Sequence, residues 1–257
     1  MSGGQGVADD RDERDDPAAE PSLDLWRRRL GRVPDEVWRR GDWRVLILAE
    51  NDLTAVPDAI GRLARLRTLD LGHNALTELP DAIGDLTGLS DFLYVHDNRL
   101  SALPGTIGRL ARLRYLNVGD NPLAELPASL GGMAALRELR AENCALARLP
   151  DSLGTLTRLR ELWLRGNRLT ALPPSAARLA DLRHLDLRGN ALTAVPEPLA
   201  GLPRLRHLDL RANRIRALPD WITALPALEK LDLRWNDTAI PAAAVAALEE
   251  RGCAVLY

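Results

Sequence analysis

A 23-residue period runs through this chain and restricts its fold more than any other feature. Asparagines recur at a spacing of 23, with one interval of 24, at positions 51, 74, 98, 121, 167, 190, 213 and 236. The position expected at 144 carries Cys144 instead. Prolines keep the same spacing, each after Leu or Val, at positions 57, 80, 104, 127, 150, 173, 196 and 219. Self-similarity of this length is typical of solenoids, in which each unit contacts only its neighbours.

One unit of the period can be read in residues 63–86, LARLRTLDLGHNALTELPDAIGDL. Its segment 69–71 alternates apolar and polar residues, which is typical of a short strand. Pro80 suits the first position of a short helix or 3₁₀ segment, where no backbone N–H is needed. The leucine pattern around the asparagine resembles the leucine-rich repeat over about residues 22–241. The period of 23 and the L-P-x-x-I-G-x-L half are similar to the Ras-group-like class, found in intracellular scaffold, plant and bacterial proteins.

The resemblance implies an α/β solenoid: a leucine-rich-repeat horseshoe with a parallel β-sheet on its concave side and short helical or 3₁₀ segments on its convex side. Leucines would point inward, and the Asn74 amide would satisfy backbone groups of its turn and join its neighbours in a ladder. Gly84 is expected to permit a tight bend on the outer arc. A narrow repeating slot of this kind accounts for 51 leucines in 257 residues, of which only 4% are aromatic.

The two ends of the chain depart from the repeat. Residues 1–20 hold seven acidic residues against two arginines and offer almost nothing apolar to bury. We expect a disordered tail there, with an acidic interaction arm as the alternative. Arg28 stands at the asparagine position of a degenerate first repeat, and Pro241 begins an alanine-rich helix, so both ends predict caps over the terminal leucines. The predicted parts are a disordered acidic tail (1–21), an N-terminal capping repeat (22–44), leucine-rich repeats (45–240), and a C-terminal capping helix with a closing segment (241–257).

Strand residues that alternate with the leucines would line the concave face, and the centre of that face is aromatic. Phe92, Tyr94, Tyr115 and Trp163 fall there, in a chain that has only six Trp, three Tyr and one Phe. Exposed aromatic side chains are common anchors of protein interfaces. The alternative is that these rings stack on one another and cover the sheet. One extra residue in segment 90–91 precedes this strand and predicts a bulge beside the aromatic centre.

The C-terminal part of the predicted face carries ordered charge. Two adjacent columns are expected, Arg165, Arg188, Arg211 and Arg234 beside Asp186, Asp209 and Asp232. The columns indicate either a solvated face in which each aspartate neutralises a nearby arginine, or a partner surface with matched charges. The aspartates disfavour a nucleic-acid stripe because they cancel the positive potential.

All four histidines are also expected on this face: His73, His96, His184 and His207. A flat strand surface rarely brings three ligands together at tetrahedral geometry, which disfavours a metal site there. A mild pH dependence of binding is the more natural expectation. Trp235 lies at the C-terminal end, and the sequence leaves open whether it caps the coil or contacts a ligand.

The sequence shows no phosphate loop, no catalytic constellation and no implied pocket, so we predict no enzyme and no cofactor. Cys144 is expected to be a buried ladder substitute. We predict a non-catalytic protein–protein interaction scaffold or adaptor that binds a protein partner on its concave face. The candidate binding residues are Phe92, Tyr94, His96, Tyr115, Asn117, Arg140, Trp163, Arg165, His184, Asp186, Arg188, His207, Asp209 and Arg211.

Two alternatives stay open: a secreted or injected effector that acts on host proteins, and a regulatory subunit of a signalling enzyme. We expect a monomer that binds neither nucleic acid nor membrane, because the net charge is −2 and no apolar run approaches the length of about 18 residues that a span requires. Two cysteines and an acidic start without an apolar segment favour a cytoplasmic location.

Overall fold

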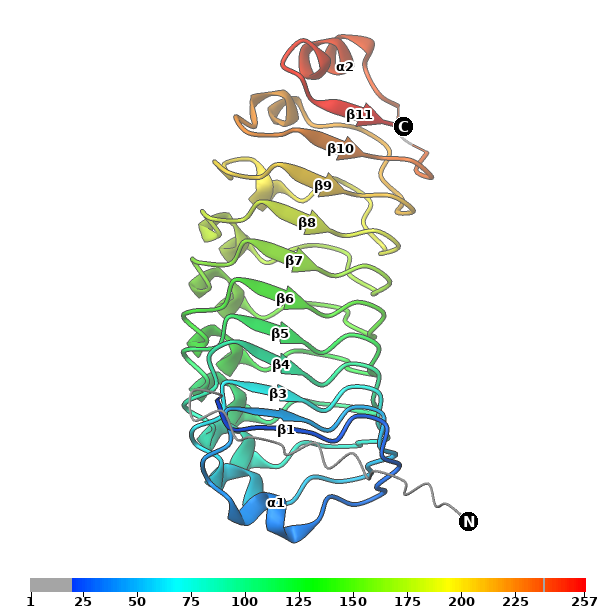
Figure 1. Ribbon diagram of the computed structural model, residues 1–257. Helices are drawn as coiled ribbons and strands as arrows, with labels where there is room; N and C mark the ends of the chain where they lie inside the picture. The colour runs from blue at the N-terminus through cyan, green and yellow to red at the C-terminus, as the bar shows by residue number, and fades with distance from the viewer. Residues whose placement is uncertain (1–19, 238) are drawn as a thin grey trace, which may run out of the picture.

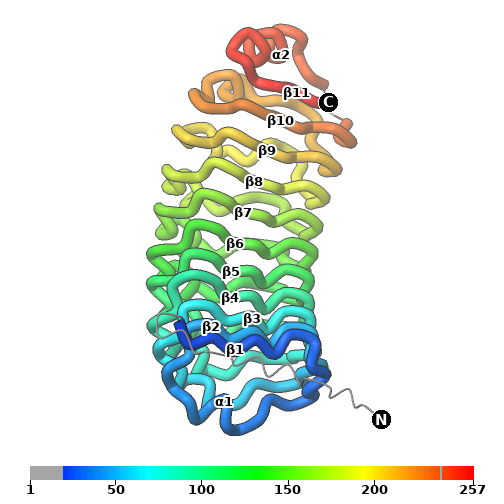
Figure 2. Tube along the Cα trace, in the orientation of Figure 1, coloured from blue at the N-terminus to red at the C-terminus, as the bar shows by residue number. Residues whose placement is uncertain are grey.

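The computed structural model describes residues 20–237 and 239–257, which form an elongated solenoid with one short strand per turn (Figure 1). The strands form a single parallel sheet in chain order, and each contacts only the strand before and the strand after it (Figure 2). The predicted solenoid and its parallel sheet are therefore confirmed. The strands are β1 (Ser22–Asp24), β2 (Val45–Ile47), β3 (Thr68–Asp70), β4 (Phe92–Tyr94), β5 (Tyr115–Asn117), β6 (Glu138–Arg140), β7 (Glu161–Trp163), β8 (His184–Asp186), β9 (His207–Asp209), β10 (Lys230–Asp232) and β11 (Ala254–Leu256).

Short 3₁₀ helices stack on the side of the coil opposite the sheet. Each one follows a periodic proline, which is extended and leads the chain into the helix. The helices are η1 (Asp58–Arg62), η2 (Asp81–Asp85), η3 (Gly105–Arg109), η4 (Ala128–Gly132), η5 (Asp151–Thr155), η6 (Pro174–Arg178), η7 (Glu197–Leu199) and η8 (Asp220–Ala224).

Two α-helices stand at the ends, α1 (Asp35–Arg39) and α2 (Ala242–Glu249). α1 lies at the N-terminal end and α2 packs beside β11 at the other (Figure 1). Trp38 and Trp43 are buried at the first end, and Val245 and Leu248 at the second. The predicted disordered tail lies almost entirely outside the described residues.

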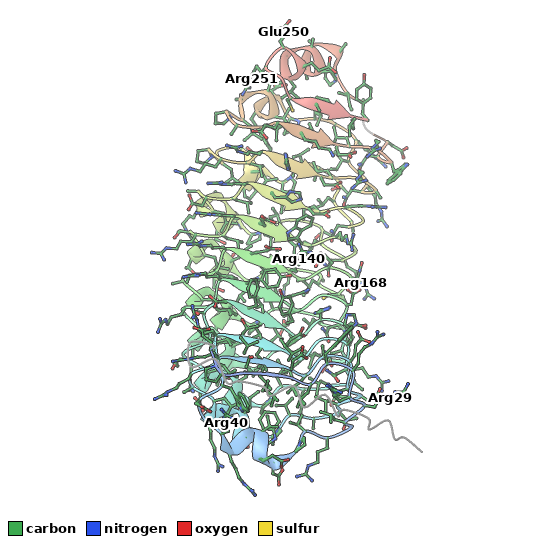
Figure 3. The ribbon with its side chains drawn as sticks, in the orientation of Figure 1. Arg29, Arg40, Arg140, Arg168, Glu250 and Arg251 are labelled. Atoms are coloured by element: carbon green, nitrogen blue, oxygen red, sulfur yellow. The ribbon has the colours of Figure 1, made fainter. Side chains whose placement is uncertain are left out.

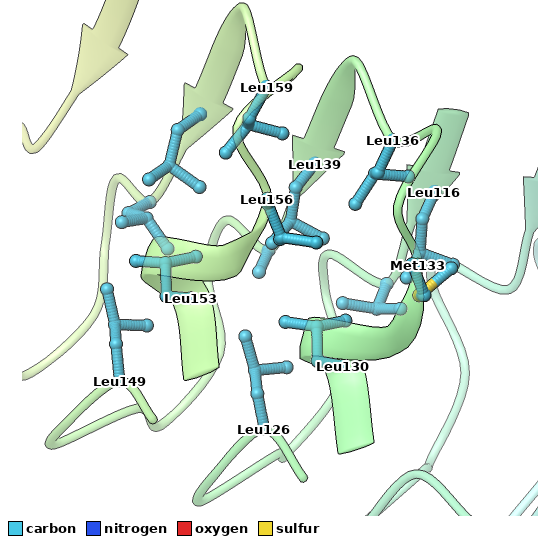
Figure 4. Packing of buried hydrophobic residues seen from close by; sticks show 14 of the residues in the cluster. Leu116, Leu126, Leu130, Met133, Leu136, Leu139, Leu149, Leu153, Leu156 and Leu159 are labelled. Atoms are coloured by element: carbon cyan, nitrogen blue, oxygen red, sulfur yellow. The ribbon is translucent and has the colours of Figure 1, made fainter. Parts of the chain in front are cut away.

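The core is a continuous column of leucines between the strands and the 3₁₀ helices (Figure 4). Leu116 and Leu139 enter it from the strands, and Leu130 and Leu153 from the helices, and all four are completely buried. Burial of such side chains contributes about 1.5–3 kcal/mol each. One turn cannot cover its own leucines, so the fold is stable only as a stack.

The predicted asparagine ladder is present. The Asn121 amide donates to the backbone oxygens of Val95 at 3.0 Å and Val118 at 3.0 Å, and its oxygen accepts the Leu100 N–H at 2.9 Å. One side chain thus ties two successive turns together. Cys144 replaces the amide with weaker thiol contacts, and burial raises the pKa of the Cys144 thiol to about 11. This cysteine is therefore a protonated structural thiol at neutral pH.

The periodic glycines serve a different purpose from the predicted bend. A Cβ atom on Gly108 would lie 2.1 Å from the Ser129 backbone oxygen, and one on Gly154 would lie 2.2 Å from the Ser175 oxygen. Neither residue has a positive φ, so the glycines permit close approach of successive 3₁₀ helices rather than an unusual turn. The last three helices carry Ala177, Ala200 and Thr223 at or beside the same place.

The residue just before each ladder position adopts the left-handed conformation, which the repeat pattern did not predict. Only Gly166 and Gly189 among these residues are glycines. His73, Ala212 and Trp235 have φ values of 53°, 51° and 62°. A side chain in this region carries a conformational cost that glycine avoids.

Candidate functional site

The sheet register brings the predicted aromatic residues together. Phe92 of β4 lies opposite Tyr115 of β5, and Tyr94 lies opposite Asn117. The ring centroids of Tyr94 and Tyr115 are 5.0 Å apart, and that of Phe92 is 5.5 Å from that of Tyr115. Phe92 is 41% exposed in spite of these contacts. The rings therefore stack on one another and also present an apolar surface, so the two interpretations of the sequence are compatible.

Two histidines extend this aromatic cluster toward β3. His96 lies 5.9 Å from Tyr94 and 4.7 Å from His73, measured between ring centroids. The His96 ring packs over Gly72, where a Cβ would come within 2.5 Å of it. His73 also contacts Asp97, with its Nδ1 2.6 Å from the carboxylate. His73 belongs to this surface, although it was not among the candidate binding residues.

Arg140, which is labelled on the sheet in Figure 3, connects the cluster to the next aromatic group. Its guanidinium lies 5.9 Å from the Tyr115 ring centroid and 4.8 Å from that of Trp163. Glu138 holds the guanidinium through a hydrogen bond of 2.6 Å from Arg140 Nε. An arginine between two aromatic faces is a favourable cation–π arrangement and fixes a long side chain in one orientation.

Beyond Arg140 the surface continues across β7, β8 and β9. Trp163 stacks on His184 at 4.1 Å, and His184 meets His207 edge-on at 5.5 Å. These three side chains line one wall of a hollow of about 300 Å³. The hollow corrects the prediction that no pocket is present. Its other lining residues are Arg165, Asp186, Leu208, Asp209, Arg211, Lys230 and Asp232.

The contacts join His73, His96, Tyr94, Phe92, Tyr115, Arg140, Trp163, His184 and His207 into one continuous row, which we call the concave belt. The hydroxyl groups of Tyr94 and Tyr115 form no hydrogen bond within residues 20–237 and 239–257. They are available to a partner. Burial raises the pKa of Tyr115 to about 12, so its hydroxyl stays a donor at neutral pH.

The charged columns are paired only at their C-terminal end. Arg211 Nε donates to Asp209 at 2.9 Å and lies 3.5 Å from Asp232, and Arg234 contacts Asp232 at 2.7 Å. Burial disfavours ionised Asp232, but hydrogen bonds from Arg234 and the charge of Arg211 outweigh burial and lower its pKa. Mutual neutralisation therefore describes β9 and β10.

Asp186 and its neighbours form no such close pair, although the charges of Arg165 and Arg211 act on the Asp186 carboxyl. Asp186 is 6% exposed, and its contact is the Arg188 backbone N–H at 2.9 Å. Burial raises the pKa of the Asp186 carboxyl. Among the described residues, Arg165 and Arg188 have no carboxylate partner. The Arg165 guanidinium is therefore available in the lining of the hollow, whereas Arg188 lies outside that lining and approaches the Trp235 ring at 5.3 Å.

A local turn explains why aspartate or asparagine recurs at the strand ends. Asp70, Asp186 and Asp209 each accept the backbone N–H two residues later, at 2.8, 2.9 and 3.1 Å. Asn117 accepts the Gly119 N–H in the same way at 3.0 Å. These side chains fold the chain away from the strand. Asn117, Asp186 and Asp209 thus have a structural role in addition to their place on the concave face.

Trp235 lies against the arginine column rather than over the core. It is 63% exposed, and the guanidinium groups of Arg188, Arg211 and Arg234 lie 5.3, 5.8 and 5.7 Å from its ring. The sequence left its role open. The structure makes it a further exposed aromatic group beside the arginine column, with three guanidinium groups near its ring.

Burial lowers the pKa of His96 and of His184, and the neighbouring histidine in each pair lowers it further. Both rings are therefore neutral at pH 7, where a neutral imidazole can accept or donate one hydrogen bond.

Within the described residues, no group of three or more His, Cys, Asp or Glu side chains has an arrangement that could hold a metal ion. Among the described helices, none combines the length and apolar character that crossing a bilayer requires.

The leucine-rich repeat family matches the chain over residues 43–100, 157–215 and 196–237, which is more than half of its length. The chain therefore belongs to the leucine-rich repeat family. Proteins with these repeats are generally protein-interaction modules, and their repeat fold is typically a non-catalytic binding scaffold. No curated protein sequence matches the chain significantly.

Several solved structures resemble it. A TDR receptor has a TM-score of 0.80 and 29% identity, over 92% of this chain and 42% of that chain. The Arabidopsis receptor kinase HAESA, solved with the peptide hormone IDA and the co-receptor SERK1, has a TM-score of 0.74 and 30% identity, over 85% and 38%. The leucine-rich repeat domain of the type III effector XopL has a TM-score of 0.74 and 32% identity, over 86% and 78%. The chain spans less than half the length of these two receptor structures.

Proposed function

We propose that this protein is a non-catalytic scaffold or adaptor that binds a protein partner through the concave belt. The observation that carries the proposal is the continuity of the belt. Aromatic, imidazole and guanidinium side chains contact one another without a break from His73 to His207. Tyr, Trp and Arg are the residues that contribute most to protein interfaces.

The chemistry of the belt fits an extended polypeptide segment. Neighbouring strands lie about 4.8 Å apart, so the belt from β3 to β9 is roughly 29 Å long. Its rings supply flat apolar contact area, and free tyrosine hydroxyls supply hydrogen bonds to a peptide backbone. The hollow next to Trp163, about 300 Å³ in volume, can take one side chain of the partner. The guanidinium group of Arg165, which lines the hollow and has no carboxylate partner among the described residues, favours an acidic residue there.

The period of 23 residues supports assignment to the Ras-group-like class of repeats, and with it a role in intracellular signalling. Both cysteines are free, Cys253 buried and Cys144 half-buried, which fits a reducing compartment such as the cytoplasm. We propose a monomer, because the helices α1 and α2 cover the two ends of the leucine core.

One observation favours a second candidate function, an injected effector that acts on host proteins. The chain is 32% identical to the repeat domain of a type III effector and covers 78% of that structure. The concave belt would be the binding surface in this case too. Detection of the protein outside the producing cell, or inside a host cell, separates the effector from a resident scaffold.

The test is affinity capture from the source organism with wild-type protein and two matched double variants. Tyr94→Ala/Trp163→Ala removes one tyrosine and one tryptophan from the belt. Trp26→Ala/Tyr257→Ala removes the same pair from exposed sites outside it, where Trp26 is 49% and Tyr257 71% exposed. We expect the belt variant to lose at least about 90% of a specific partner, equivalent to about 1.4 kcal/mol, and the control to retain it. Equal recovery by all three proteins contradicts the proposal.

A further inference from the structure

One edge of the solenoid, away from the concave belt, carries a groove of about 720 Å³ that is lined by seven arginines. The groove lies where the chain leaves the 3₁₀ helices and enters the strands. Four of its arginines stand one residue before a strand: Arg44, Arg67, Arg114 and Arg137. The other three stand three residues before a strand: Arg65, Arg112 and Arg158. The period therefore builds two parallel rows of arginines along this edge.

Much of this charge is not neutralised by the rest of the fold. Among the described residues, Arg65, Arg112, Arg137 and Arg158 have no carboxylate partner. All four side chains are exposed. Like charges that lie side by side repel one another, and an anionic ligand removes that repulsion.

Two carboxylates of the chain show which kind of anion these rows accept. Asp91 stands where an arginine would precede β4, and its carboxylate lies 3.4 Å from Arg67 and 3.5 Å from Arg114, on the repeats to either side. Glu20 belongs to the lining of the groove and also contacts Arg67. The fold therefore already pairs carboxylates with the arginines of this edge, and one carboxylate fits between the arginines of two repeats.

The rest of the lining favours an extended peptide over a nucleic acid. Apart from the arginines and Glu20, the lining residues are small: Ala64, Gly88, Ser90, Ala111 and Ala135. Among the described residues that line the groove none is aromatic, so it offers no surface on which bases could stack. Small side chains leave room for the backbone of a peptide between the long arginines.

We propose that this groove binds an extended acidic segment of a partner protein, about seven residues long. The arginines belong to the repeats of β2 to β7, which strands spaced by about 4.8 Å place about 24 Å apart. An extended chain of about seven residues covers the same length, at about 3.3–3.6 Å per residue. Successive side chains of an extended peptide point to opposite sides, so its carboxylates face the two rows alternately.

The groove gives the protein a second binding surface, which does not rest on the proposed function of the concave belt. The two surfaces share no residue, so Tyr94→Ala/Trp163→Ala should leave binding in the groove unchanged. A chain with both surfaces can hold two partners at once, as an adaptor does. The contact is electrostatic and exposed, so salt weakens it: the screening length falls from about 10 Å in 0.1 M salt to about 3 Å in 1 M salt.

The test measures the fluorescence anisotropy of a labelled heptapeptide of alternating glutamate and aspartate, titrated with the full chain. A control peptide carries glutamine and asparagine at the same positions. We expect saturable binding of the acidic peptide, weakened at least about tenfold between about 0.1 and 1 M salt. The control peptide should not bind.

Two matched double variants locate the contact. Arg112→Gln/Arg137→Gln removes two groove arginines that have no carboxylate partner among the described residues. Arg204→Gln/Arg206→Gln removes two from the same edge beyond the groove, where carboxylates already pair with them. We expect the first variant to weaken peptide binding at least about fivefold and the second to change it less than about twofold. Equal melting temperatures show that both variants are folded.

The proposal is overturned if the acidic peptide does not bind, or if both variants bind it as tightly as the wild type. Inorganic polyphosphate, a single-stranded oligonucleotide and anionic lipid vesicles serve as competitors. Displacement of the peptide by one of them at a charge concentration about tenfold lower assigns the groove to that anion instead. Peptide binding that appears only after the six acidic residues in 9–16 are replaced by amides assigns the groove to the chain's own segment, and it overturns the proposal equally.

Discussion

The repeats from η1 to η5 and those from η6 to η8 share one leucine core but differ on both of their surfaces. The earlier repeats carry glycine where their 3₁₀ helices meet, as Gly108 and Gly154 do, while the later ones carry Ala177, Ala200 and Thr223. On the concave side, β4 and β5 in the earlier region present a cluster of aromatic rings, and β9 and β10 in the later region present paired arginine and aspartate.

This difference shows that the residues of the core and the residues of the two surfaces vary independently along the coil. Leu116 and Leu208 occupy equivalent slots and are 0% and 1% exposed, whatever the chemistry outside. The concave residues are therefore free to form a binding surface without loss of the core. The predictions that follow test which features are common to both regions and which are not.

The asparagine ladder is common to both regions, so its removal should cost the same in each. Asn121→Ala and Asn213→Ala each leave several backbone groups without a hydrogen-bond partner. The Asn213 amide donates to the backbone oxygens of Leu187 at 2.9 Å and Leu210 at 3.0 Å, as the Asn121 amide does to those of Val95 and Val118. We expect about 4 kcal/mol of lost unfolding free energy for either variant, measured by urea denaturation. A difference above about 2 kcal/mol between them would show that the regions differ inside as well as outside.

The convex glycines are specific to the earlier repeats, and a reciprocal pair of substitutions tests their role. Gly154→Ala places a Cβ 2.2 Å from the Ser175 oxygen and should cost about 3 kcal/mol. Ala177→Gly, at the equivalent place one repeat later, should cost only about 0.5–1 kcal/mol through backbone entropy. Equal costs in thermal unfolding would mean that close helix approach is not the reason for glycine.

Titration of the histidines should change the unfolding free energy only weakly, and in the same direction for His96 in the earlier region and His184 in the later region. His96 and His184 have pKa values below the ordinary 6.5 because burial disfavours the charged ring. The unfolded chain then binds protons more readily, so stability is complete above pH 6.5 and falls as the pH drops through the folded-state pKa values.

The expected loss for each histidine is below about 1 kcal/mol, because the rings are partly exposed to solvent. His96→Asn and His184→Asn should each flatten part of the profile of melting temperature against pH. A profile that is unchanged in both variants would show that other groups dominate this range.

The period, the ladder and the aromatic centre of the concave face could all be predicted because each depends on residues at fixed offsets in one repeat. The hollow beside Trp163 could not, because it depends on side-chain lengths across four neighbouring strands. The left-handed conformation of the residue before each asparagine could not be predicted either. Glycine is the usual sign of a positive φ, and only Gly166 and Gly189 among these residues are glycines.

The role of Gly84 was wrongly predicted for a related reason. A glycine can indicate either a positive φ or a close contact with neighbouring backbone. The sequence does not distinguish these two roles, because the close contact depends on the position of the next helix. A groove lined by Arg44, Arg67, Arg114 and Arg137 could not be predicted from the strand pattern, because these arginines stand just before their strands and not on the concave face.

The concave belt as the partner-binding surface is the central claim, and hydroxyl-radical footprinting of the complex with a captured partner tests it most directly. The account predicts protection of Tyr94, Tyr115 and Trp163 by at least about threefold, with Trp26 and Tyr257 unchanged. Protection confined to Trp26, Tyr257 or the convex helices, with the three belt residues as reactive as in the free protein, would contradict it.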